Sequence, residues 1–149
     1  MTEIFVDADA CPVKDEVMRV AGRHAIRTRM VSDGGVRPVR DPLVDIVIVP
    51  QGADAADDWI AEHIGPTDVC VTSDIPLAAR CLEKGAQALK PNGDPFTADG
   101  IGMALANREL MQNLRDSGEV TGGPRPFSRA DRSRFLDQLE VAVQNAKRR

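Results

Sequence analysis

The sequence predicts an α/β fold with a central, mainly parallel β-sheet and helices on its faces. Short β-branched apolar runs alternate with segments whose apolar residues recur at helical spacing, which gives a βαβαβ-type order. The length of 149 residues fits one domain with a buried core. We therefore expect a single domain over residues 1–149, whose C-terminal part from about residue 101 is helical.

The expected elements follow one another along the chain. Residues 2–7 form a strand, and Pro12 suits a helix start because proline lacks the donor that a helix N-terminus leaves unpaired. Alternating arginines predict a half-exposed strand over residues 26–31. The β-branched runs at 45–50 and 68–74 predict strands that are buried on both faces. The remaining predictions are a short terminal strand at 86–89 and helices at 13–22, 53–64, 76–85, 101–114 and 128–146.

Composition excludes several classes of protein. No apolar run approaches the ~20 residues that span a bilayer, and the N-terminus lacks a secretory pattern, so we expect a cytoplasmic protein without membrane contact. Cys11, Cys70 and Cys81 have no close spacing and are predicted to be buried reduced thiols. The net charge of −4 argues against nucleic-acid binding, yet the tail after residue 100 is basic and could meet phosphates or simply face solvent.

Carboxylates gather where strands of the predicted sheet end. Asp7 and Asp9 close the first apolar run, and they point the same way if the strand continues through Asp9. Asp74 follows a later strand, and Asp54 and Asp57 lie in the helix between. Parallel strands bring such ends to one edge, where oxygen ligands suit Mg²⁺ or Mn²⁺. We predict a metal site from these five acids, although each alone could cap a helix or face solvent.

Four ordered blocks of sequence carry a resemblance. They are Asp-Ala-Asp-Ala-Cys-Pro-Val-Lys at 7–14, Gly-Ala-Asp-Ala-Ala-Asp at 52–57, Val-Thr-Ser-Asp-Ile-Pro-Leu-Ala at 71–78 and Thr-Gly-Gly-Pro at 121–124. Together they resemble the YaiI/YqxD family of uncharacterised bacterial proteins, which is assigned to the PIN-like group of metal-dependent nucleases. The resemblance implies a PIN-like three-layer sandwich with helices on both faces and an acidic metal centre. It also implies a further carboxylate, for which Asp94, Asp99 and Asp131 are candidates.

Three functions are compatible with these features. The leading hypothesis is a metal-dependent nuclease that cleaves RNA or single-stranded DNA, with Asp7 and Asp74 as its catalytic residues and a metal-activated water. A phosphatase of the haloacid-dehalogenase type with Asp7 as nucleophile is the rival enzyme. The third is a non-catalytic module that binds nucleic acid or protein. The last helix could pack on the sheet or form a homo-oligomer with a second subunit. The predicted substrate-binding residues are Lys14, Thr72, Ser73, Arg125 and Arg132.

Overall fold

The computed structural model describes residues 1–52, 54–116 and 126–149. Its centre is a six-stranded sheet of order β3-β2-β1-β4-β5-β6, in which only β6 runs antiparallel to its neighbour. The strands are β1 (Glu3–Asp7), β2 (Arg27–Ser32), β3 (Val44–Ile48), β4 (Val69–Val71), β5 (Gln87–Leu89) and β6 (Pro95–Phe96). The helices are the short 3-10 turn η1 (Ala8–Ala10) and α1 (Lys14–His24), α2 (Ala55–His63), α3 (Ile75–Glu83), α4 (Ala98–Asp116) and α5 (Arg129–Lys147).

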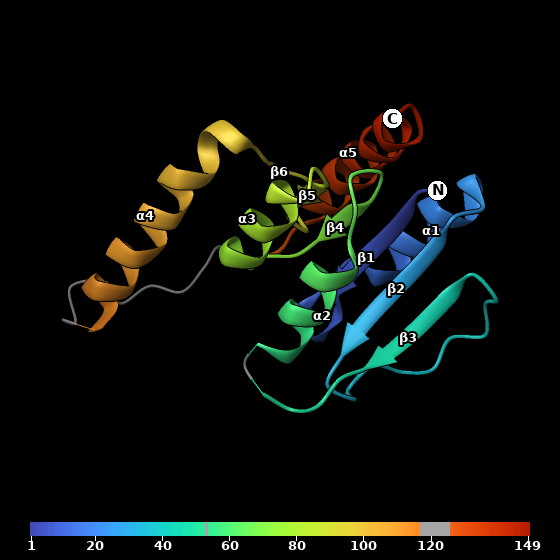
Figure 1. Cartoon of the computed structure of the whole chain (residues 1–149), viewed down its shortest axis with the longest axis horizontal. Helices are drawn as coiled ribbons and strands as arrows, with labels where there is room; N and C mark the ends of the chain where they lie inside the picture. Colours follow the sequence, from blue (N-terminus) through green and yellow to red (C-terminus); the bar gives the residue numbers. More distant parts are fainter. Residues whose placement is uncertain (53, 117–125) are drawn as a thin grey trace.

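Helices cover both faces of this sheet, which confirms the predicted α/β three-layer sandwich (Figure 1). Successive residues of β1 point to opposite faces, so Ile4 and Val6 pack with α1 and α5 while Phe5 packs with α2 and α3. The three cysteines are buried free thiols, as predicted. Among the described residues, no helix is both long and apolar enough to cross a membrane.

The C-terminal helix α5 belongs to this sandwich. It begins with a capping box, in which the Ser128 side chain accepts from the Asp131 backbone and the Asp131 side chain accepts from the Ser128 backbone. One stripe of α5 that includes Phe135, Leu139 and Val143 is fully buried against the sheet and α1. The apolar stripe that could have met a second subunit is therefore used within the chain.

Two parts of the sheet differ from the prediction. The run over residues 45–50 does not form a strand that is buried on both faces, because β3 lies at the edge of the sheet, where Ile48 is 61% exposed. The chain also continues beyond β5 into the antiparallel strand β6, which was not predicted. The helix α4 contacts α3 and packs Ile101 against the core, and the rest of it projects away from the sandwich, with Met103 and Leu110 exposed (Figure 1, yellow to orange).

The order of the strands changes direction between β1 and β4, and we use the word crevice for this position at the carboxyl ends of the two strands. From β1 the chain builds outward through β2 and β3, and it then returns to the other side of β1 to form β4 and β5. In open parallel sheets, ligands bind outside the carboxyl ends of the strands at such a change of direction. Asp7 ends β1, and Thr72 follows β4, so both lie at this position.

Candidate functional site

Asp7 and Asp74 are joined through the side chain of Thr72. The Thr72 hydroxyl donates to Asp7 Oδ2 over 3.0 Å, and its oxygen accepts from the Asp74 backbone N over 3.0 Å. Thr72 itself is buried, and its backbone N donates to the carbonyl of Leu89 in β5. Two acids that are far apart in the sequence are thus held at the crevice between β1 and β4 by one fixed hydroxyl.

Asp74 also begins helix α3. Its Oδ1 accepts from the backbone N of Leu77 over 2.8 Å, and Pro76 occupies one of the first helical positions. The capping role that the sequence left as an alternative is therefore present. Capping uses one carboxylate oxygen of Asp74. The negative charge of Asp74 also helps to raise the pKa of Asp7 and of Asp57.

The electrostatics of this edge are those of crowded carboxylates. Burial raises the pKa of Asp7, the charges of Asp74 and Asp9 raise it further, and the hydrogen bond from Thr72 opposes the increase. Burial is also the main cause that raises the pKa of Asp57 from its usual 3.8 to about 6. The negative charges of Asp74, Asp7 and Asp54 add to this effect, in that order. These five acids therefore form one interacting group.

The α2 acids divide into different environments. Asp54 is the exposed N-cap of α2, and Asp57 is a half-buried residue of its first turn. Their neighbour Asp58 is exposed and forms an ion pair with Arg80 of α3 over 2.7 Å. Asp57 is consequently the α2 carboxylate that lies among the acids of the crevice, and Asp58 is matched by a cation.

Asp9 is turned toward β2. The strand ends at Asp7, and Asp9 lies in η1, so the condition for both acids to share one face of the strand is not met. Asp9 Oδ1 accepts from the Ser32 hydroxyl over 2.6 Å, and Oδ2 accepts from the Asp33 backbone N over 3.1 Å. Sequence reasoning missed Ser32 as this partner, although a serine at the end of a strand was a visible signal.

The donor atoms of this edge fit a hard divalent cation. They are carboxylate and hydroxyl oxygens, which Mg²⁺ and Mn²⁺ prefer, and their mutual repulsion is relieved when positive charge binds. Within the described ranges, no three Asp, Glu, His or Cys side chains already converge on a metal position.

The predicted substrate-binding residues have separate locations. Thr72 is buried beneath the acids, and Ser73 is exposed directly beside them. Lys14 begins α1 and donates to the carbonyl of Cys11 over 3.1 Å. Arg132 is bound at the β1–α1 junction, where it donates to the Pro12 carbonyl over 2.7 Å and pairs with Glu16 over 3.0 Å. Arg125 and the Thr-Gly-Gly-Pro block at 121–124 lie outside the described residues.

The candidates for a further carboxylate have other contacts. Asp94 lies in the turn between β5 and β6 and forms an ion pair with Arg134 of α5. Asp99 is exposed in the first turn of α4, and Asp131 is committed to the capping box of α5. None of these three acids contributes to the raised pKa values of Asp7 and Asp57.

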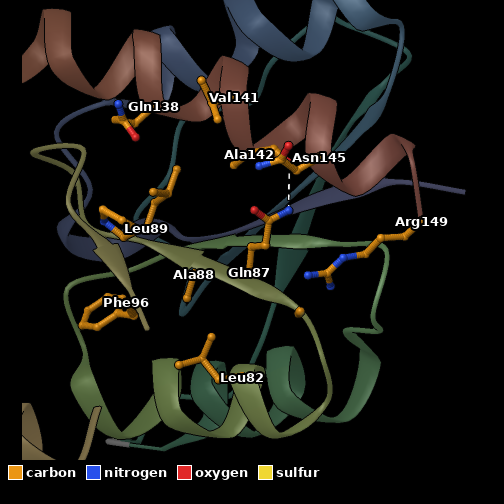
Figure 2. Close-up of a pocket in the computed structure, with 12 residues that line it drawn as sticks. Leu82, Gln87, Ala88, Leu89, Phe96, Gln138, Val141, Ala142, Asn145 and Arg149 are labelled. Atoms are coloured by element: carbon orange, nitrogen blue, oxygen red, sulfur yellow. Dashed lines mark hydrogen bonds between the residues drawn. The ribbon is translucent and has the colours of Figure 1, made fainter. Parts of the chain in front are cut away.

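A pocket of about 310 Å³ lies at the β5 edge between α3 and α5, away from the acids (Figure 2). Leu82, Ala88 and Phe96 supply apolar walls, and no Asp or Glu lines it. Gln87 Nε2 donates to the Ala142 carbonyl over 2.8 Å, and Arg149 donates to the carbonyls of Pro66 and Gly85. The first bond connects β5 with α5, and the bonds of Arg149 connect the residues after α5 with the loops before β4 and β5.

Comparisons with known proteins agree on one family. The model of the uncharacterised YaiI/YqxD family matches residues 5–145. A UPF0178 protein of Parvibaculum lavamentivorans is 60% identical over 149 residues, covering 100% of this chain and 98% of the relative. A UPF0178 protein of Rhodospirillum rubrum is 57% identical, covering 98% of each chain. No solved structure matches. The names of these relatives state no activity.

Proposed function

Given that the chain belongs to the uncharacterised YaiI/YqxD family, we propose that it is a divalent-cation-dependent nuclease that hydrolyses phosphodiesters of RNA or single-stranded DNA. Asp7, Asp57 and Asp74 would hold Mg²⁺ or Mn²⁺ directly or through water, with Asp9 and Asp54 beside them. A bound cation of this kind activates water and stabilises charge on phosphoryl oxygens. The resemblance to the PIN-like group supports the same reaction.

One observation carries this proposal. Burial, together with the charges of carboxylates from the start of α3, from β1 and from the start of α2, raises the pKa of Asp57 to about 6. These acids lie at the position where open parallel sheets bind ligands. A fold that keeps acids together in this way is less stable unless positive charge binds among them. A perturbed group in a crevice is also a typical sign of a functional site.

The residues around the acids have positioning roles in this proposal. Thr72 holds Asp7 and the start of α3 in a fixed relation through its single hydroxyl. Ser32 and the Asp33 backbone hold Asp9 on the β2 side. The exposed Ser73 lies where it can donate to a phosphate oxygen of the substrate.

The test is cleavage of labelled single-stranded RNA and DNA in Mn²⁺, Mg²⁺ or EDTA. We expect cation-dependent cleavage by the wild type and at least a ~100-fold loss in Asp7→Asn, since losing even a partner that orients a metal ligand reduces activity by about 10–100-fold. Asp74→Asn is a second variant that removes the negative charge and keeps the helix cap, because asparagine also caps helices and should leave α3 intact. Asp137→Asn on the exposed side of α5 is the matched control and should cleave like the wild type.

Two results would refute the proposal. One is an equal rate in the wild type and Asp7→Asn, which would mean that cleavage does not use this edge. The other is the absence of cleavage by any variant across varied substrates. Nucleic-acid binding that persists unchanged in Asp7→Asn and Asp74→Asn, without turnover, would instead identify the non-catalytic binding module.

A further inference from the structure

A pocket of about 350 Å³ lies between the start of α1 and the loop that follows β2. We call it the basic pocket. Its volume is within the ~300–1,000 Å³ range of ligand pockets. Four side chains give it apolar walls, namely Met18, Met30, Val36 and Val39, and its other lining residues are Lys14, Asp15, Gly35 and Arg37.

Hydrogen bonds link the basic pocket to Asp9. Asp9 accepts from the Ser32 hydroxyl, and the Ser32 oxygen accepts in turn from the backbone N of Gly34 and of Gly35 over 3.0 and 3.2 Å. Gly35 lines the pocket. On the other wall, Lys14 Nζ donates to the carbonyl of Cys11, which follows η1 directly. The two segments that border Asp9 thus also form the pocket.

The charges of the basic pocket are available to an anion. Arg27, Arg29 and Arg80 each pair with a carboxylate, whereas Lys14 and Arg37 form no ion pair with a described residue. Asp15 is the one acid that lines the pocket. Two cations and one acid therefore line this pocket, which shares the loop after β2 with the contacts of Asp9.

We propose that the basic pocket seats the nucleotide next to the phosphodiester at the acidic edge. Its base and sugar contact the apolar walls, and Lys14 and Arg37 contact the neighbouring phosphates. This assignment rests on the proposed function for the identity of the ligand. Apolar walls beside cations that form no ion pair with a described residue are what distinguish a nucleotide from a bare phosphate as the occupant.

Binding without catalysis tests the pocket separately. In EDTA, a short fluorescein-labelled single-stranded RNA is titrated with the wild type, Arg37→Glu, Lys14→Gln and Arg108→Glu. Arg37 and Arg108 are both exposed, so charge reversal should leave the fold intact, and Arg108 on α4 is the matched control. We expect Arg37→Glu to weaken binding at least ~10-fold, with a salt dependence shallower by about 0.7 for each lost phosphate contact. Lys14→Gln should weaken binding less, and Arg108→Glu should leave it unchanged.

Competition identifies the occupant. Adenosine monophosphate should displace the RNA from the wild type at a lower concentration than inorganic phosphate does, and this advantage should shrink in Arg37→Glu. Equal potency of the two competitors, or an equal loss of affinity in Arg37→Glu and Arg108→Glu, would overturn the assignment. If Asp7→Asn loses cleavage while Arg37→Glu binds RNA like the wild type, only the assignment of the basic pocket is refuted. If Arg37→Glu weakens RNA binding but the wild type never cleaves, only the proposed nuclease activity is refuted.

Discussion

Asp57→Asn is expected to stabilise the cation-free protein at neutral pH. Asp57 is half-buried in the first turn of α2, and burial together with the charges of Asp74, Asp7 and Asp54 opposes its ionisation. Asparagine keeps nearly the same shape and removes the charge. The variant therefore loses the repulsion at this position without leaving a cavity.

The sign and size of the effect follow from the pKa. Because folding raises the pKa of Asp57 from 3.8 to about 6, the stability contributed by the protonated form is fully present below about pH 4 and is lost as the pH rises through about 6. The full difference corresponds to ~3 kcal/mol, and solvent screening at this partly exposed position reduces it to ~1 kcal/mol. Asp57→Asn should thus exceed the wild type by ~1 kcal/mol at pH 7 and match it near pH 4.

Urea denaturation in EDTA at several pH values measures this difference. The matched control is Asp58→Asn, which neutralises the next residue and removes only an exposed ion pair with Arg80, so it should bring no gain. Saturating Mn²⁺ should then stabilise the wild type by ~2–3 kcal/mol at about 100-fold excess over its dissociation constant, and stabilise Asp57→Asn less. Parallel pH profiles for the wild type and Asp57→Asn would refute the reasoning.

Three further predictions concern contacts around the site and in the core. Thr72→Val should lower cation-dependent cleavage about 10–100-fold by releasing Asp7, and Thr72→Ser should restore most of it; equal rates in both variants would contradict the positioning role. Arg132→Ala should reduce the free energy of unfolding by ~1 kcal/mol because it loses its bonds to the β1–α1 junction, whereas Arg129→Ala, the control, should not. Phe135→Ala should destabilise the fold by ~3–5 kcal/mol in urea, and a loss below ~1 kcal/mol would argue against α5 as part of the core.

The sequence was a good guide to the layers of the fold, because four of the predicted helices, at 13–22, 53–64, 76–85 and 128–146, bury a periodic apolar face. It was a poor guide to sheet order. The run around Ile48 has the composition of a central strand, and nothing local in it reveals that no strand follows on its outer side. Strand β6 has only two residues, one of them Pro95, so it carries no alternation from which to be predicted.

The acids were predicted as site residues from their places at strand ends and in the helix after β3, whereas the contacts that orient them were not predicted. The direction of Asp9 depends on where β1 stops, and its partner Ser32 lies on another strand. Arg132 was predicted to bind substrate because it is a basic residue of the tail, yet its guanidinium bonds to the Pro12 carbonyl. Such contacts depend on tertiary packing. A single sequence does not show which residues that are far apart along the chain lie close together in the fold.

The hydroxyl bridge from Thr72 to Asp7 also bears on how the site forms during folding. Its two residues are 65 positions apart, and β4 is the strand that brings them together. A chain that has been synthesised only as far as α2 contains Asp7 and Asp57 but has neither the bridge nor Asp74. Affinity for a cation at this edge should therefore appear only after this long-range strand pairing, which is a slow kind of step in folding.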